Sequence, residues 1–314
     1  MSATANGGRL ALPEHYDVLA KLHQSNKDAV FKARQRPSGA VVVVKAYAGD
    51  HEAQQEAQSL RQLQGHPNIV RLQQVEVDAE TKRTFLVMEY CNSGLTHILK
   101  AAPTGLPTPD AAHIAVQLLS ALAHMHAQQM VYLNLRPDHV MCCMDDNAGA
   151  SVKLVNFRRV SMAPTKTVPR KPAKYDSPDL LQQCRYDAPE VLVGEPPTPA
   201  ADVWSFGCVL GEMLTGKPIF SGASPASAMQ CIMLAVGLPP ERVTALMRGR
   251  PAFAACTQSM TQCVESQKDS ALARRFGMVL RESPTMLQVL LACLSMSAAQ
   301  RPSAAALLAH PAFA

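Results

Sequence analysis

The chain has 314 residues, of which 47% are hydrophobic, so it is long enough to bury one large core or two lobes that share a cleft. Its formal charge of +5 is modest and its basic residues form no long run, which argues against binding to nucleic acid or a membrane. No stretch is apolar enough to cross a bilayer, and the N-terminal residues have no apolar signal core. Nine cysteines without a C-x-x-C pair indicate free, mostly structural thiols. We expect a cytoplasmic or nuclear protein, or one of a cytoplasmic structure, that is neither secreted nor membrane-spanning.

Residues 16–87 have the pattern of β-strands interrupted by one helix. Short apolar runs, of which the four valines at 41–44 are the clearest, alternate with turn residues. Between residues 51 and 64 the apolar side chains recur at helical spacing, and the sequence Gly-His-Pro-Asn at 65–68 ends that helix. This region predicts a small β-rich lobe of about five strands and one helix.

The character of the chain changes after residues 89–94. Long apolar helices are predicted over residues 108–128, 200–214 and 226–236, and several more follow residue 240. No repeat or low-complexity linker separates them. We therefore predict an N-terminal tail over residues 1–15, a β-rich lobe over 16–90 and a larger helical lobe over 91–314, which together form an α+β fold.

Three short motifs of the second lobe are specific in combination. They are Ala188-Pro189-Glu190, the run from Asp202 to Gly207 (D-V-W-S-F-G), and Gln300-Arg301-Pro302. Because they occur in the right order, the chain resembles protein kinases over residues 16–313, and the segments at 216–220 and 237–239 resemble the cyclin-dependent and mitogen-activated kinase branch. The resemblance implies a bilobal fold in which Arg301 pairs with Glu190 and Asp202 braces the catalytic loop. It also implies an apolar stack between the lobes, formed by Leu60, Leu72, Tyr132 and Phe157.

The resemblance places a vestigial ATP site between the lobes. Lys45 and Glu56 stand at the family's ion pair, which we expect to be structural here, while Glu89 and Cys91 would supply backbone groups at the hinge. The glycines of the phosphate-binding turn are absent, and Asp28 would place a negative charge near phosphate oxygens. We therefore expect weak or absent ATP binding and no cofactor.

The positions that carry kinase chemistry are substituted. Asn134 stands where the family has its general base, and an amide cannot take up a proton near neutral pH. Asn156 and His139 stand where the family holds its magnesium ions, which prefer carboxylate oxygens. Arg158 replaces a hinge glycine and places a cation where metal or phosphate would lie. The sequence therefore predicts neither base catalysis nor a metal site.

From these substitutions we predict that the chain is not an enzyme. It would be a pseudokinase, an inactive homologue that works as a protein-interaction scaffold or an allosteric partner. Two alternatives stay open. The chain could be a weak or unconventional ATP-dependent serine/threonine phosphotransferase that uses Lys45 and an improvised metal site. It could also be a nucleotide-binding switch that binds ATP without metal.

The loop between Arg158 and Gln183 is the candidate surface for protein partners. Among several prolines it contains four basic residues, Lys166, Arg170, Lys171 and Lys174. A solvated loop and a docking surface for an acidic partner both fit this composition. The predicted partners are proteins, and neither nucleic acid nor membrane is expected.

Overall fold

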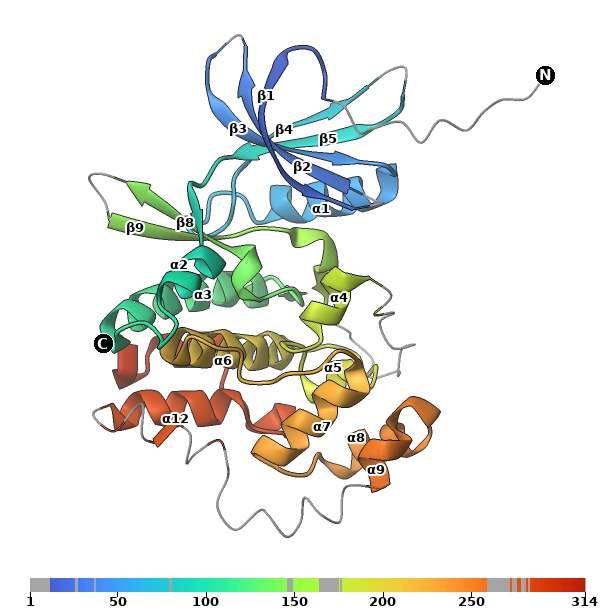
Figure 1. Ribbon diagram of the computed structural model, residues 1–314, viewed down its shortest axis with the longest axis vertical. Coiled ribbons are helices and arrows are strands. Elements are labelled where there is room, and N and C mark those ends of the chain that lie inside the picture. Colours follow the sequence, from blue (N-terminus) through green and yellow to red (C-terminus); the bar gives the residue numbers. More distant parts are fainter. Residues whose placement is uncertain are drawn as a thin grey trace, which may run out of the picture.

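The computed structural model describes residues 12–25, 28–36, 38–78, 81–145, 149–163, 175, 177–258, 272, 276–277, 281 and 283–313. A lobe dominated by a β-sheet stands on a larger lobe dominated by helices (Figure 1). This arrangement confirms the predicted α+β bilobal fold. The four basic loop residues lie outside the described residues, so their role in binding a partner stays a prediction.

The first lobe contains a five-stranded antiparallel sheet in the order β1-β2-β3-β5-β4. The strands are β1 (Tyr16–Gln24), β2 (Asp28–Gln35), β3 (Val41–Tyr47), β4 (Leu72–Val77) and β5 (Thr84–Glu89). Because successive side chains of a strand point to opposite faces, Val42, Val44 and Ala46 join a small apolar cluster on one face. Lys45 and Tyr47 point to the other face. The alternation along β3 thus directs one lysine away from the small cluster and toward the interior of the molecule.

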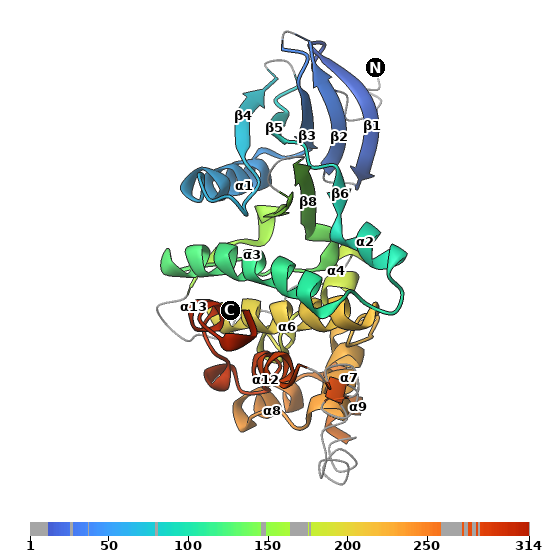
Figure 2. The same cartoon turned by 90° about the vertical axis from the view of Figure 1, so that its left-hand side faces the viewer.

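Helix α1 (Asp50–Gln62) lies below the sheet, on the side of the second lobe (Figure 2). It covers most of the helix predicted over residues 51–64. Ala53, Ala57 and Leu60 are buried at the spacing of one helical face, and Glu56 is buried on the same face. The helix therefore carries a carboxylate into the apolar space beneath β3.

The second lobe is mainly helical. Its longer helices are α3 (Thr108–Ala127), α6 (Pro199–Thr215), α7 (Pro225–Val236), α8 (Glu241–Arg248) and α12 (Pro284–Cys293). Its shorter helices are α2 (Leu95–Ala101), α4 (Pro178–Gln183), α5 (Pro189–Leu192), α9 (Ala254–Gln258) and α13 (Ala304–Leu308). Its short strands are β6 (Ser93–Gly94), β7 (Met130–Val131), β8 (Val140–Asp145), β9 (Gly149–Leu154) and β10 (Ser161–Met162). The 3₁₀ turns are η1 (Pro137–His139), η2 (Phe157–Arg159), η3 (Pro251–Phe253), η4 (Ala298–Gln300) and η5 (Pro311–Phe313).

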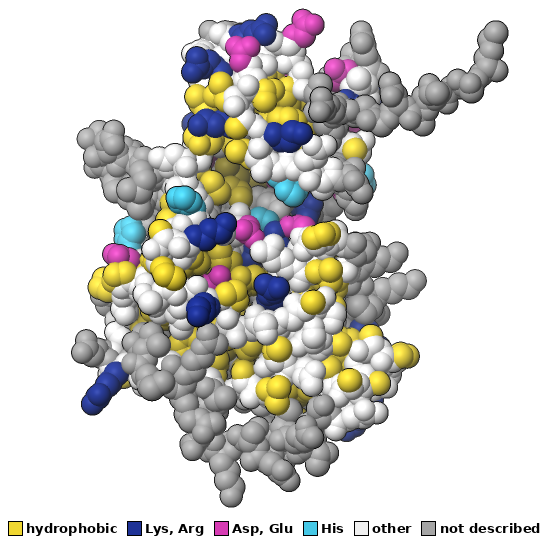
Figure 3. Space-filling model, in the orientation of Figure 1, with side chains coloured by type: hydrophobic (Ala, Val, Ile, Leu, Met, Phe, Trp, Pro, Cys, Tyr) yellow, Lys and Arg dark blue, Asp and Glu magenta, His cyan; other side chains and the backbone are white. Residues whose placement is uncertain are grey.

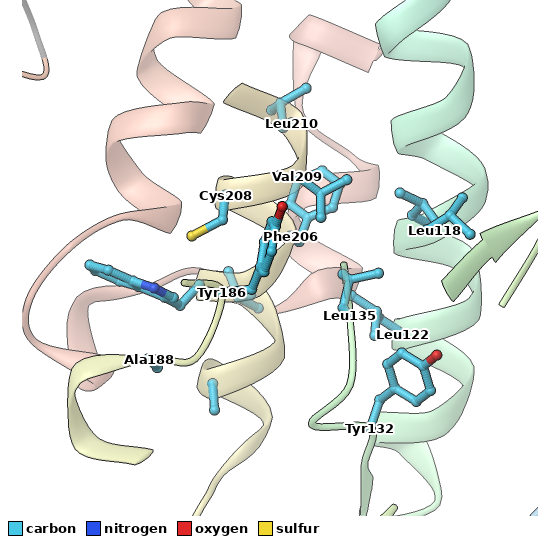
Figure 4. Close-up of a cluster of buried hydrophobic side chains, with 14 of the residues drawn as sticks. Leu118, Leu122, Tyr132, Leu135, Tyr186, Ala188, Phe206, Cys208, Val209 and Leu210 are labelled. Atoms are coloured by element: carbon cyan, nitrogen blue, oxygen red, sulfur yellow. The ribbon is translucent and has the colours of Figure 1, made fainter. Parts of the chain in front are cut away.

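Helix α6 forms the centre of the second lobe. All its residues from Ala201 to Leu214 are buried. Phe206 and Val209 belong to the apolar cluster that also contains Leu118 and Leu122 of α3 (Figure 4). A helix that is packed on every side in this way is a rigid base for the polar residues at its N-terminal end.

The two lobes are joined by hydrogen bonds and by one continuous apolar cluster. The Val70 amide donates to the Leu154 carbonyl at 3.0 Å, and the Leu154 amide donates to the Asn68 carbonyl at 2.9 Å. The four side chains predicted to link the lobes all lie buried in the same cluster: Leu60, Leu72, Tyr132 and Phe157. The ring centroids of the two aromatic residues are 5.2 Å apart. This packing fixes α1 over the segment that contains η2.

Two expectations from composition can be compared with the structure. Six described cysteines are free, namely Cys142, Cys184, Cys208, Cys231, Cys256 and Cys293. Cys91 is disulfide-bonded, so the expectation of free thiols is wrong for this residue. Among the described residues, none of the helices combines the length and the apolar character that a membrane span requires.

Candidate active site

Charged and histidine side chains gather in the hollow between the two lobes (Figure 3). Six of the eight residues predicted for the site are linked here by hydrogen bonds or ion pairs: Lys45, Glu56, Asn134, His139, Asn156 and Arg158. They come from β3, α1, the segment after β7, η1 and the start of η2. The fold thus brings together residues that are more than 100 positions apart in the sequence.

Lys45 and Glu56 form a buried ion pair. The Lys45 ammonium lies 2.8 Å from Glu56 Oε2, and the Phe157 amide donates to Glu56 Oε1 at 2.9 Å. The Tyr47 hydroxyl also donates to Glu56 Oε2. Burial, followed by the charge of Glu56, raises the pKa of Tyr47, so this hydroxyl keeps its proton. Both oxygens of Glu56 are therefore satisfied, and the lysine is held in one position.

The side chain of Asn156 connects this ion pair to the segment that contains Asn134 and His139. Its Oδ1 accepts from the Lys45 ammonium at 3.1 Å, and its Nδ2 donates to His139 Nε2 at 2.9 Å. His139 Nδ1 donates to the Asn134 carbonyl at 2.7 Å, and Asn134 Nδ2 donates to the Asn156 carbonyl at 2.7 Å. Asn156 has φ 63° and ψ 68°, a left-handed conformation that asparagine tolerates better than most residues. We call this closed circuit of hydrogen bonds the Asn-His ring.

His139 is a neutral imidazole in the Asn-His ring. Its Nδ1 faces a carbonyl oxygen and its Nε2 faces an amide N–H, so a single proton on Nδ1 satisfies both contacts. Burial, and next the positive charge of Arg136, lower the pKa of His139 to about 3. The ring therefore depends on the uncharged histidine at neutral pH.

This depressed pKa predicts an acid-sensitive contribution to stability. In the unfolded chain His139 has an ordinary pKa of about 6.5, so below that pH its imidazole is protonated. In the folded chain the same imidazole stays neutral at these pH values, so protonation favours the unfolded chain. Stability is full above about pH 6.5 and is lost as the pH falls toward 3. Between about pH 6.5 and 4.5 we expect the free energy of unfolding to fall by about 2 kcal/mol more in wild type than in His139→Gln. Urea denaturation at each pH measures the difference, and parallel curves would contradict it.

Magnesium, which the kinase resemblance implies, does not fit these residues. Mg²⁺ requires octahedral oxygen coordination and usually one or two carboxylates. Asn156 and His139 offer one amide oxygen and one imidazole nitrogen, and both atoms are engaged in the contacts described above. In the described part of the chain, no three His, Cys, Asp or Glu side chains are grouped so that they could hold a metal ion. We therefore assign no metal-dependent step to this site.

Side-chain charges of alternating sign continue from Lys45 across the hollow. Asp28 Oδ2 lies 3.8 Å from the Lys45 ammonium and 3.5 Å from Arg158 Nη1. Arg158 Nη2 and Arg136 Nη2 both donate to the carboxylate of Asp179 on α4. Although burial acts in the opposite direction, these two arginines hold the pKa of Asp179 below its ordinary value. The Asp179 carboxylate is therefore ionised at neutral pH.

The buried carboxylate of Asp202 holds the backbone before Asn134. Its Oδ2 accepts from the Tyr132 amide at 2.8 Å and contacts His126 Nε2 at 2.8 Å, while its Oδ1 accepts from the Leu133 amide at 2.8 Å. Leu133 has φ 59°, which is unfavourable for a leucine. Asp202 thus fixes a strained turn and braces the loop as the resemblance predicted.

The two remaining predicted site residues lie at the connection between the lobes. The Glu89 carboxylate accepts from the Arg71 amide at 2.7 Å and lies 3.0 Å from the Lys153 ammonium. Its side chain therefore links the segment before β4 to β9. Cys91 is buried and disulfide-bonded. A contact of either residue's backbone with a nucleotide stays a prediction.

Two residues that sequence reasoning missed are central to the site. Arg136 is two positions after Asn134 and is buried, and its charge is a signal that could have been noticed. Asp179 lies in a segment that matches none of the motifs used above, and only the folded chain shows its two arginine partners. Neither was predicted as a functional residue.

Comparisons with known proteins agree with this geometry. A family model described as "Protein kinase domain" matches residues 16–313. Cyclin-dependent kinase-like 4 of Mus musculus is 27% identical over 303 residues, which cover 94% of this chain and 82% of the relative. Cyclin-dependent kinase 4 of Bos taurus is 32% identical over 245 residues, which cover 72% of this chain and 76% of the relative. Cyclin-dependent kinase-like 2 of Oryctolagus cuniculus is 27% identical over 308 residues, and the chain spans half its length.

These relatives are named as kinases, which overturns one prediction. The prediction that the chain is not an enzyme is wrong, because the family and the relatives that it matches are those of phosphotransferases. The substitutions at Asn134, His139 and Asn156 do not outweigh a match over nearly the whole chain. The match over residues 16–313 and the relative that is 32% identical together show that the chain belongs to the protein kinase family, in its cyclin-dependent kinase branch.

Proposed function

We propose that this chain is an unconventional ATP-dependent serine/threonine protein kinase whose transfer site lies between the lobes around Lys45. The observation that carries the proposal is the buried pair of Lys45 and Glu56 at 2.8 Å, with the same ammonium 3.1 Å from Asn156 Oδ1. A lysine held in this way presents a fixed positive charge to the phosphates of a nucleotide. The names of the relatives support the choice of a kinase over other nucleotide-dependent enzymes.

The chemistry proposed here depends on position and charge. Phosphoryl transfer passes through a loose transition state, so most of the catalysis comes from alignment and electrostatic stabilisation. The substrate hydroxyl oxygen attacks the terminal phosphorus, the bond to the bridging oxygen breaks, ADP leaves, and the hydroxyl proton passes to a phosphoryl oxygen. Lys45 stabilises the developing charge, and Asn134 Oδ1 orients the hydroxyl as a hydrogen-bond acceptor.

Replacing Lys45 by methionine tests the proposal. We expect transfer of labelled phosphate from ATP to a serine/threonine peptide to fall about a hundredfold, because one preorganised positive charge is lost. The measurement is initial rate, with magnesium, with manganese and with a chelator. A metal-independent rate in the wild type would agree with the poor fit of magnesium.

The matched control is Lys21→Met, because Lys21 is an exposed lysine of β1 that donates to Gln24. Its rate should equal that of the wild type. Wild-type protein that transfers no label above a blank under any of the three conditions would end the kinase proposal. Equal rates for the wild type and Lys45→Met would end the role of Lys45.

A second candidate is the nucleotide-binding switch that needs no metal. The Asn-His ring favours it, because the ring contains neither a group that titrates near neutral pH nor a carboxylate for magnesium. A thermal-shift titration with ATP separates the two candidates. A shift that is the same with and without magnesium, in protein that transfers no phosphate, supports the switch.

A scaffold role through the basic loop remains a prediction from the sequence. The four cations on which it depends, Lys166, Arg170, Lys171 and Lys174, lie outside the described residues. A pull-down repeated with these four residues neutralised tests whether they recruit a protein partner.

A further inference from the structure

Two guanidinium groups hold a single carboxylate in the hollow between the lobes. Arg136 Nη2 binds one oxygen of Asp179, and Arg158 Nη2 binds the other. Arg136 Nη1 also donates to the Asp179 carbonyl at 2.7 Å. The Arg136 side chain is 5% exposed and that of Arg158 is 21% exposed, so water screens these contacts only in part. Arg136 and Arg158 thus form an anion-binding site that the carboxylate of Asp179 occupies.

The geometry of that site suits a phosphate. Arginine binds carboxylate and phosphate oxygens through the same planar fork of N–H donors. A terminal phosphate has three acceptor oxygens and a larger charge than a carboxylate, so it can accept from both arginines at once. Lys45 stands further along the same row of charges, beyond Asp28. A nucleotide whose phosphates lie along this row would meet cations at Lys45, Arg158 and Arg136, with the Asp28 carboxylate between the first two.

Because magnesium does not fit this site, Lys45, Arg136 and Arg158 are the groups that could neutralise the phosphates of a nucleotide. ATP carries several negative charges, and a site that takes no divalent ion must neutralise them with side chains. We propose that Arg136 and Arg158 form a metal-independent site for the terminal phosphate of a nucleoside triphosphate, for which the Asp179 carboxylate competes. The inference rests on the nucleotide-binding part of the proposed function and adds the groups that bind the phosphate and the group that blocks it.

Asp28 Oδ2 lies 3.5 Å from Arg158 Nη1 and Asp138 Oδ2 lies 3.5 Å from Arg136 Nε, whereas Asp179 bonds both arginines. Asp179 is therefore the anion that a phosphate would have to displace. Its side chain is 26% exposed and belongs to a helix of only six residues. Asp28 is 4% exposed at the start of β2, where its carboxylate also accepts from Ser25 Oγ at 2.5 Å. A nucleotide therefore competes with a contact from α4, and binding of the terminal phosphate would release the Asp179 carboxylate from both arginines while the Arg136 bond to the Asp179 carbonyl could persist.

The test is the affinity for ATP, ADP and inorganic phosphate in the presence of a chelator. Asp179→Asn removes the competing charge, and we expect ATP to bind about tenfold more tightly, since a charged hydrogen bond contributes about that factor. Arg158→Gln should weaken ATP about tenfold and ADP less, because ADP lacks the terminal phosphate. Inorganic phosphate should also gain affinity in Asp179→Asn if the site recognises phosphate alone.

Glu241→Gln is the matched control for loss of one carboxylate, because Glu241 pairs with Arg248 on the exposed surface of α8 at 3.1 Å. It should leave all three affinities unchanged. Thermal unfolding checks each variant, and Arg158→Lys, which keeps the charge but loses the fork, replaces Arg158→Gln if the latter does not fold. Unchanged or weaker ATP binding by Asp179→Asn overturns the inference, as does ATP binding that needs magnesium in every variant.

The two proposals can fail separately. Affinities that change as expected in protein that transfers no phosphate would end the kinase proposal and leave the phosphate site standing. Phosphate transfer that persists while Asp179→Asn and Arg158→Gln leave the affinity for ATP unchanged would refute the phosphate site and leave the kinase proposal standing.

Discussion

Replacing Arg301 by methionine is expected to lower the free energy of unfolding by about 3–5 kcal/mol, because it leaves the buried charge of Glu190 without its partner. The two side chains form a forked ion pair, with Nη1 to Oε1 at 2.6 Å and Nη2 to Oε2 at 2.9 Å. The arginine is fully buried and also donates to the carbonyls of Ala200 and Ser295 at 3.0 and 2.8 Å. A single change therefore removes four hydrogen bonds that join three separate segments.

Urea denaturation of the purified protein measures this effect. Arg248→Met is the matched control, because Arg248 pairs with Glu241 at 3.1 Å while both side chains are mostly exposed, and its loss should cost less than about 0.5 kcal/mol. A double variant, Glu190→Leu with Arg301→Met, removes the orphaned charge and should recover part of the stability. A loss below about 1 kcal/mol in Arg301→Met would refute the claim that the pair is structurally important.

Replacing Asp202 by alanine should lower stability by a similar amount and abolish phosphate transfer. The carboxylate accepts from the amides of Tyr132 and Leu133 and contacts His126, so its removal leaves buried donors unsatisfied at about 1–3 kcal/mol each. We expect a total of about 3–5 kcal/mol. Because Leu133 is held at φ 59°, its backbone should relax and displace Asn134.

Hydrogen exchange locates the effect. The Tyr132 and Leu133 amides should lose protection in Asp202→Ala and keep part of it in Asp202→Asn, which retains one acceptor oxygen. Asp110→Ala, on the exposed first turn of α3, is the matched control and should change neither protection nor activity. Retained protection of both amides in Asp202→Ala would mean that other contacts hold the loop.

Local patterns predicted most elements of the fold. The helices expected over 108–128, 200–214 and 226–236 are present as α3, α6 and α7, since their apolar spacing reflects the faces that they bury. Within the predicted β-rich lobe, β4 begins only at Leu72, after the apolar residues Ile69 and Val70. Ile69 and Val70 instead bond to Leu154 of the other lobe, and no local pattern contains that contact.

Some contacts of the candidate site could likewise be predicted from the sequence, and others could not. The resemblance to kinases implied that Lys45 and Glu56 pair, and the structure places the Lys45 ammonium 2.8 Å from Glu56 Oε2. The contacts of Asp179 could not be predicted, because the short helix α4 matches no motif and its partners Arg136 and Arg158 are distant in the sequence. The prediction that the chain is not an enzyme was wrong because it was drawn from the substituted positions, although the resemblance already covered residues 16–313.

The Asn-His ring bears on how this chain can evolve. In Asn156→Asp, a carboxylate oxygen would face the lone pair of His139 Nε2 where an N–H now donates, so the histidine would have to take up a proton against its depressed pKa. An amide at position 139 would not carry this cost, because its oxygen can accept a hydrogen bond and its nitrogen can donate one. A carboxylate at position 156 therefore meets a lower energetic barrier after His139 has changed to an amide than before.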